Sequence, residues 1–170
     1  MTREEAVEMF QSDDLIGIGR EADGLRKKLH PERIVTYSVE PETESADAIA
    51  AVSFAAAETA EDRVTQLDTL RRIQEQSGRF AVIVPSFTGT AVEYLKSLAI
   101  SRIYLENIPH LQSSPAIAGS KVCQIALRFG ADDLGTVVDG MTEEDVRRLI
   151  RDAGFIPKQR SALFRMYSLS

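Results

Sequence analysis

Short apolar runs alternate along the chain with longer amphipathic stretches. Three runs have the length and composition of β-strands: RIVTYSV at 33–39, AIAAVSF at 48–54 and FAVIV at 80–84. They are rich in β-branched and aromatic residues, and the third is apolar at every position, as in a parallel strand covered on both faces. Shorter strands are predicted near 107–113 and 134–138, so about four or five strands are expected in all.

Between these runs, apolar residues recur at helical spacing. Helices are predicted over 3–11, 14–29 and 59–78, from 88 or 90 towards 101, around 122–129, and over 142–154. Three of them open on a threonine followed three residues later by an acidic residue, the capping-box pattern: Thr2 with Glu5, Thr59 with Asp62, and Thr142 with Asp145. Short strands alternating with amphipathic helices indicate an α/β fold whose mostly parallel strands are joined by right-handed crossovers.

Composition limits the class of protein. A chain of 170 residues with 44% hydrophobic content is long enough for one core and short for two domains, so we expect a single domain over 1–170. The net charge of -6 argues against nucleic acid as a partner, because phosphate binding needs an excess of Lys and Arg. No apolar run is long enough to span a bilayer, so no membrane partner is expected. A single cysteine fits a reducing compartment, and the expected localisation is cytoplasmic.

The stretch 99–138 holds most of the unusual polar residues, in the connections between its apolar segments. We take seven of them as candidate ligand-binding residues: Glu106, Asn107, His110, Gln112, Arg128, Asp132 and Asp133. His110 is also the one candidate for catalysis, as a general acid or base, against a structural hydrogen-bonding role. Adjacent aspartates usually point apart, so Asp132 and Asp133 suit ligand orientation or pairing, with Arg128 for example, better than catalysis.

Two other features look functional but have simpler explanations. Gly17, Gly19 and Gly24 follow no strand and fit neither the dinucleotide nor the Walker spacing, so helix packing explains them better than a phosphate loop. The acidic segment 40–47 contains Pro41 and suits a solvated surface loop better than a metal site. No metal site is expected.

Several long runs resemble one enzyme family. SRIYLENIPHLQ (101–112), GSKVCQIALRFGADDLG (119–135) and MTEEDVRRLIRDAGFIPKQRSALF (141–164) are similar to the C-terminal portion of the radical S-adenosylmethionine enzymes of the futalosine route to menaquinone, above all to dehypoxanthine futalosine cyclase. Upstream, 15–39 and 51–87 resemble barrel segments of the same family. The resemblance implies a partial (β/α) TIM-barrel-like domain: N-terminal helices over 1–32, a barrel fragment over 33–138 and a C-terminal helical cover over 141–170.

The chain departs from this family in ways that bear on function. The family's first strand leads into a CxxxCxxC loop for an iron–sulfur cluster, whereas here Val39 continues as EPETESADAIAAV and Cys123 is the only cysteine. Such a cluster needs several thiolates, so neither it nor S-adenosylmethionine is expected as a cofactor. The family's Ser-Trp-Val-Thr-Gln-Gly-like segment is replaced by residues 114–119, SPAIAG, and the acidic segment after Gly135 is shortened.

The leading hypothesis is therefore a non-catalytic or accessory protein that binds a small nucleoside-like or aromatic molecule, or a full-length paralogue. The alternatives are a cluster-free enzyme that uses His110 and the carboxylates on a small molecule of the menaquinone pathway, and one half of a split radical enzyme. A partial barrel leaves strand edges unpaired, so a homodimer also stays open as a partner.

Overall fold

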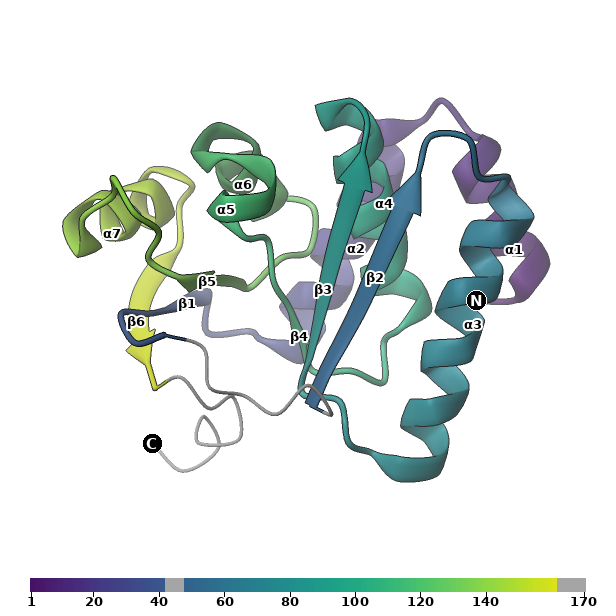
Figure 1. Cartoon of the computed structure of the whole chain (residues 1–170), viewed down its shortest axis with the longest axis horizontal. Coiled ribbons are helices and arrows are strands. Elements are labelled where there is room, and N and C mark those ends of the chain that lie inside the picture. Colours follow the sequence, from purple (N-terminus) through teal and green to yellow (C-terminus); the bar gives the residue numbers. More distant parts are fainter. Residues whose placement is uncertain (42–47, 162–170) are drawn as a thin grey trace.

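The computed structural model describes residues 1–41 and 48–161. Within them the chain forms seven helices and six strands (Figure 1). In chain order these are α1 (Arg3–Gln11), α2 (Leu15–Leu29), β1 (Ile34–Ser38), β2 (Ile49–Ala55), α3 (Ala60–Ser77), β3 (Val82–Thr88), α4 (Ala91–Tyr104), β4 (His110–Leu111), α5 (Pro115–Ala118), α6 (Ser120–Ala126), β5 (Asp133–Thr136), α7 (Glu143–Asp152) and β6 (Ile156–Arg160).

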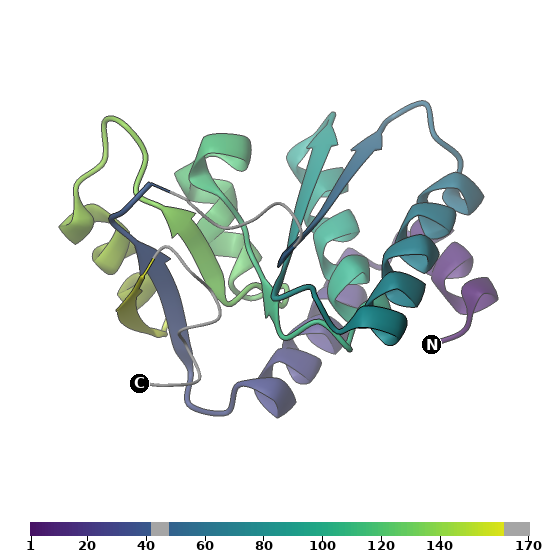
Figure 2. The same cartoon turned by 60° about the horizontal axis from the view of Figure 1, so that its bottom comes forward.

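The strands form two parallel three-stranded sheets. One has the order β2-β3-β4 and the other the order β5-β1-β6. A single bridge between Gln112 and Asp133 joins them, giving one strand order of β2-β3-β4-β5-β1-β6. Figure 2 shows the dark blue β1, green β5 and yellow β6 together on the left, with the blue and teal strands β2 and β3 to their right. This α/β architecture is consistent with the predicted partial barrel, and β2 and β6 are its edge strands among the described residues.

The two faces of the sheet differ in what covers them. Successive strand residues face opposite sides, and along β2 Ala50, Val52 and Phe54 are buried whereas Ala51 and Ser53 are exposed. The buried side faces the helices: the ring of Phe54 lies 5.9 Å from that of Phe10 in α1, measured between centroids. We call the opposite side the open face. Figure 1 shows α2 and α4 behind β2 and β3, away from the open face.

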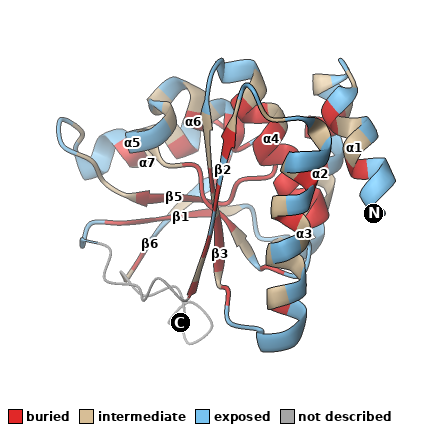
Figure 3. Ribbon diagram, turned by 45° about the vertical axis from the view of Figure 1, so that its right-hand side comes forward, coloured by how far each residue is buried: buried red, intermediate tan, exposed pale blue. Residues whose placement is uncertain are grey.

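The core lies between the sheet and these helices, and Figure 3 shows its buried residues along the strands and α4. The helix beginnings follow from the sequence. Thr2, Thr59, Thr90 and Thr142 each accept a hydrogen bond from a backbone N–H three residues later in a complete capping box. Gly78 ends α3 in the left-handed conformation that glycine adopts without strain.

Three details differ from the sequence prediction. The segment 103–105 was open to either helix or strand, and α4 continues through Tyr104. The strand expected near 107–113 is reduced to the two residues of β4. The predicted helical cover over 141–170 contains a helix, α7, but residues 156–160 form strand β6 and pair with β1 in parallel.

Other predictions fall partly outside the described residues. The acidic loop extends from Glu40 into residues 42–47, and the predicted cover extends into 162–170; both of these ranges lie outside the described part of the chain. Among residues 1–41 and 48–161, no helix combines the length and apolar character needed to cross a bilayer.

Candidate functional site

The seven predicted ligand-binding residues do not gather in one place. Glu106 borders a groove on the helix side of the molecule. The Asn107 carbonyl accepts a hydrogen bond from the Gln74 amide at 3.1 Å, which ties the end of α4 to α3. The Arg128 guanidinium lies over the ring of Phe155, 5.1 Å from its centroid, and makes no pair with either aspartate. The remaining four residues occupy two separate sites on the sheet.

The first site lies at the amino ends of the strands. His110 is the first residue of β4, Asp132 immediately precedes β5, and His30 caps the end of α2 before β1. The Asp132 Oδ2 atom lies 2.7 Å from His110 Nδ1 and 3.1 Å from His30 Nε2. The two imidazole rings stack with centroids 4.9 Å apart, and His30 Nε2 is also 2.7 Å from the Pro109 carbonyl oxygen. We call His30, His110 and Asp132 the amino-end cluster.

The surroundings of Asp132 keep its carboxyl group ionised. Its other oxygen, Oδ1, accepts the Leu111 N–H at 2.7 Å and lies 3.9 Å from Arg102 Nη2. Burial by itself raises the pKa of Asp132, but the hydrogen bond and charge of His110, with the charges of Arg102 and His30, lower that pKa below its usual value. Arg102 is fully buried and donates to the Ile108 carbonyl. The cluster is thus a buried charged network.

The position of His110 in the sheet argues against a role as a general acid or base. In (β/α) barrels the reacting groups lie at the carboxyl ends of the strands, and the amino ends serve stability. His110 lies at the amino end, whereas the resemblance implies a connection that approaches the substrate cavity.

The second site is on the open face. Arg160 of β6 donates to both oxygens of Asp133, through Nε to Oδ2 at 2.7 Å and through Nη2 to Oδ1 at 3.0 Å. Thr36 Oγ1 donates to Oδ2 at 2.7 Å, and the Gly135 N–H donates to Oδ1 at 2.7 Å. Asp133 is fully buried and Arg160 is 6% exposed, so this is a buried, bidentate ion pair.

Gln112 lies beside that ion pair, in the bridge that joins the two sheets. Its side chain is 4% exposed, and its Oε1 atom has no hydrogen-bond partner among residues 1–41 and 48–161. It crosses over Gly135, where an added Cβ would lie 2.6 Å from Gln112 Nε2. Beyond Gln112 the open face carries small residues, with Ser53 exposed on β2 and Ser86 partly exposed on β3.

Among the described residues, a small pocket lies at the carboxyl end of the sheet. It has a volume of about 140 Å³ and lies between the β3–α4 connection and α5, lined by Phe87, Gly89, Thr90, Ala91, Tyr94, Ile117, Ala118 and Val122. Ile117 and Ala118 belong to the segment 114–119 that departs from the family pattern. Ligand pockets usually measure about 300–1,000 Å³, so this pocket is small for a nucleoside-like substrate.

Cys123 does not fit an iron–sulfur cluster. It is fully buried in α6, and its Sγ accepts a hydrogen bond from Ser113 Oγ at 3.2 Å. Burial raises the pKa of this thiol to about 11, so it stays protonated near neutral pH. Cluster ligation needs several thiolates, and the sequence supplies one buried thiol.

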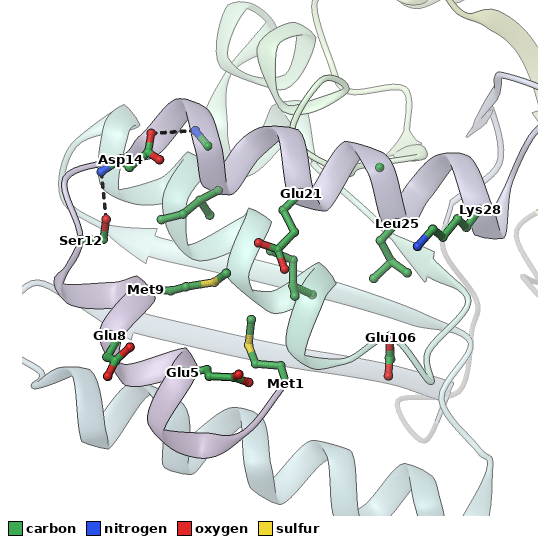
Figure 4. A pocket seen from close by; sticks show the side chains of 14 residues that line it. Met1, Glu5, Glu8, Met9, Ser12, Asp14, Glu21, Leu25, Lys28 and Glu106 are labelled. Atoms are coloured by element: carbon green, nitrogen blue, oxygen red, sulfur yellow. Dashed lines mark hydrogen bonds between the residues drawn. The ribbon is translucent and has the colours of Figure 1, made fainter.

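A groove lies on the helix side, between α1 and α2. Figure 4 shows Glu5, Glu8 and Glu21 around it, with Lys28 and Glu106 at one end. Its volume is about 890 Å³. Helix α2, which lines this groove, packs against α4.

Comparison with known proteins now adds to this geometry. The family model described as the CofH/MqnC C-terminal region matches residues 58–170, more than half of the chain. The chain belongs to the CofH/MqnC family. This confirms the resemblance drawn from the sequence.

This CofH/MqnC family member is similar in sequence to several enzymes, among them two synthases and a transferase. The aminodeoxyfutalosine synthase of Thermus thermophilus is 31% identical over 139 residues, covering 64% of this chain and 37% of the synthase. The cyclic dehypoxanthine futalosine synthase of Streptomyces coelicolor is 32% identical over 134 residues, covering 63% and 33%. A 5-amino-6-(D-ribitylamino)uracil–L-tyrosine 4-hydroxyphenyl transferase of Methanosarcina mazei is 26% identical over 208 residues, covering 97% and 54%. The chain therefore spans between a third and about half of these relatives.

Sequence reasoning missed three residues of the two sheet sites. His30 was noted only as the end of a helix, Arg160 only as part of the C-terminal segment, and Thr36 only as a strand residue. One signal was available for Thr36, because a polar residue inside a strand that pairs on both sides must find a polar partner. For His30 and Arg160 no local pattern indicates the contact, since their partners lie about a hundred and about thirty residues away in sequence.

Proposed function

We propose that this CofH/MqnC family member is a cluster-free binding or accessory protein that holds a small polar molecule on its open face. The observation that carries the proposal is the chemistry of that face. Gln112 Oε1 is a buried acceptor without a hydrogen-bond partner, and an unpaired buried acceptor costs about 1–3 kcal/mol. A ligand N–H or O–H donor that reaches Oε1 recovers that free energy.

Other polar residues on the open face favour a ligand that carries several hydrogen-bonding groups around its rim. Ser53 and Ser86 add hydroxyl groups beside small side chains, which leave space over β2 and β3. The names of the relatives include futalosines, ribitylaminouracil and tyrosine. Uracil and the phenol of tyrosine carry N–H or O–H donors, so we propose a nucleoside-like or phenolic ligand of this kind.

The absence of radical chemistry is tested by anaerobic reconstitution with iron and sulfide, followed by absorbance near 400 nm. We expect no stable cluster absorbance, because Cys123 is buried and protonated. A stable cluster band in the purified protein would overturn the cluster-free proposal.

Ligand binding is tested separately by thermal shift and calorimetry with a panel of nucleosides and phenols. The variant Ser53→Trp fills the space on the open face, and the matched control Gln76→Trp adds the same side chain at an exposed position of α3. We expect a panel member to raise the melting temperature of the natural protein and the control but not of Ser53→Trp. If no panel member binds, or if both variants respond equally, the open face is not the site.

A second candidate function rests on the sheet edges. In the described part of the chain, β2 pairs only with β3 and β6 pairs only with β1, and Ile156 of β6 is 58% exposed. Unpaired parallel edges invite a further strand, so we propose as the alternative that the chain completes its sheet with a second copy or with a full-length paralogue. Native mass spectrometry of the purified chain, alone and mixed with a purified paralogue, tests it. A monomer under both conditions would reject this alternative.

A further inference from the structure

The amino-end cluster brings three metal-ligating side chains together from distant parts of the chain. His30, His110 and Asp132 each offer one donor atom, and the three atoms lie within 4.8 Å of one another. We propose that these three residues bind a divalent transition-metal ion such as Zn²⁺. This site is independent of the ligand proposed for the open face.

Two of the three separations between the donor atoms are close to those that an ion needs, and the third is no more than 4.8 Å. Zinc bonds of about 2.0–2.2 Å to nitrogen and oxygen give neighbouring ligands separations of about 3–3.5 Å. Here Asp132 Oδ2 lies 3.1 Å from His30 Nε2 and 2.7 Å from His110 Nδ1. An ion among these atoms takes the place of the ring N–H groups that otherwise point at Oδ2, and each neutral ring then carries its proton on its other nitrogen.

The site is held in place before any ion binds. Asp132 Oδ1 accepts the Leu111 N–H at 2.7 Å, which leaves Oδ2 directed at the two histidines. The rings are stacked with an angle of 14° between their planes. Hydrogen bonds of this kind from outside the ligand set orient ligands and strengthen binding. The Pro109 carbonyl oxygen, 2.7 Å from His30 Nε2, is a further oxygen donor at the site.

Access and charge decide the class and strength of binding. The side chains of His30 and His110 are 21% and 15% exposed, so an ion can enter from solvent and keep a water ligand. Two imidazoles and one carboxylate suit Zn²⁺, Co²⁺ or Ni²⁺, whereas Ca²⁺ and Mg²⁺ prefer oxygen ligands throughout. Arg102, with Nη2 3.9 Å from Asp132 Oδ1, offsets part of the carboxylate charge. We therefore expect an affinity in the micromolar range.

The test uses the full chain without a histidine tag. Titration calorimetry with ZnCl2 measures stoichiometry and affinity, and visible absorbance after adding Co²⁺ reports the ligand set. We expect one ion per chain and cobalt bands between about 500 and 650 nm. His30→Gln keeps an N–H donor for the Pro109 carbonyl but removes the imidazole, and we expect it to weaken zinc binding by about 100-fold or more and to abolish the cobalt bands.

The sequence contains two histidines, both in the cluster, so a histidine-dependent signal has no other source. Glu21→Gln, in the acidic groove between α1 and α2, is the matched control for ion binding by carboxylates. Circular dichroism checks that His30→Gln is folded. The proposal is overturned if the natural chain binds no zinc at 1 mM, if folded His30→Gln binds as tightly as the natural chain, or if Glu21→Gln is the variant that loses binding.

Discussion

Asp132 and Asp133 are neighbours in sequence, yet their carboxylates point to different parts of the sheet and bind different partners. Asp132 turns to the amino end of the strands, where its partners are two histidines and a backbone N–H. Asp133 turns to the open face, where Arg160 and Thr36 hold both of its oxygens. Both carboxylates are buried, and both are fully engaged in hydrogen bonds.

The difference lies in the partners. Arg160 keeps its charge at every accessible pH, so the arginine of this ion pair is always charged. The histidines beside Asp132 are side chains that can ligate metals, so that network can be altered by an added metal ion. Two adjacent residues thus belong to two different networks. Asp133 belongs to a structural ion pair, and Asp132 belongs to the amino-end cluster, which a metal ion can alter.

The largest loss of stability is expected from breaking the ion pair between Asp133 and Arg160. Asp133→Asn removes the carboxylate that pairs with both nitrogens of the buried Arg160 guanidinium, and losing one partner of a buried ion pair typically costs about 3–5 kcal/mol. Urea unfolding followed by circular dichroism measures this loss. The double variant Asp133→Leu with Arg160→Met removes both charges, and we expect it to be more stable than Asp133→Asn. If the double variant is less stable than Asp133→Asn, the loss of stability in Asp133→Asn does not come from the buried charge of Arg160.

The buried thiol of Cys123 in α6 allows a second test, in which the stability of the protein is measured as a function of pH. Burial raises the pKa of Cys123 to about 11, above the value of about 8.5 for a thiol in an unfolded chain. The unfolded state therefore loses this proton first, so the stabilising contribution is complete below about pH 8.5 and is lost as the pH rises towards 11. The full loss is about 3 kcal/mol.

The measurement is the free energy of unfolding as a function of pH between about 8 and 11. Cys123→Ala will be less stable at neutral pH because it leaves a cavity, but its stability should fall less steeply over this range. Equal slopes for the two proteins would contradict the assignment. Burial also raises the pKa of Tyr94, which gives both proteins a common background slope in the same direction.

A smaller effect is expected at Asp132. Asp132→Asn keeps an oxygen acceptor for the Leu111 N–H but places an amide N–H₂ against the histidines, which can change tautomer to accept from it. We expect a loss of about 1–3 kcal/mol, less than for Asp133→Asn, in the same unfolding experiment. A larger loss for Asp132→Asn than for Asp133→Asn would reverse the comparison between the two networks.

The smallest effect concerns the contact between Gly135 and Gln112. Gly135→Ala and Gly140→Ala both place a side chain at positive φ, at 71° and 87°, which costs about 1 kcal/mol or more in each case. Only at Gly135 does the new Cβ meet a neighbour, Gln112 Nε2 at 2.6 Å. We expect Gly135→Ala to be less stable than Gly140→Ala by about 1 kcal/mol. Equal losses would mean that Gln112 moves aside freely.

Much of the fold was predictable because its signals are local. Capping threonines with acidic partners located the starts of α1, α3 and α7 to within a residue, and continuous apolar runs located β1, β2 and β3. Strand β6 gave no such signal, since its IPKQR sequence is polar and contains Pro157. An edge strand tolerates proline and charge because one side of it needs no sheet hydrogen bonds.

The candidate sites were less predictable than the fold. The expectation that Asp132 and Asp133 point apart is in line with strand geometry, and their partners have been identified in His30, His110 and Arg160. The seven candidate polar residues do not lie together, because residues close in sequence are divided between different parts of the sheet and its helices. Which side a residue reaches depends on strand register, which a single sequence leaves open.

The strand order has a consequence for how the chain acquires its structure during synthesis. Strands β2, β3 and β4 follow one another and can pair as soon as residue 111 has left the ribosome. Strand β1 is made earlier than all of them, but its neighbours are β5 and β6, which end at residue 160. The first strand must therefore wait, unpaired and apolar, for nearly the whole chain, and long-range pairings of this kind fold slowly and expose aggregation-prone surface. The half of the sheet that holds the Asp133–Arg160 pair is for this reason the half that we expect to form last during synthesis.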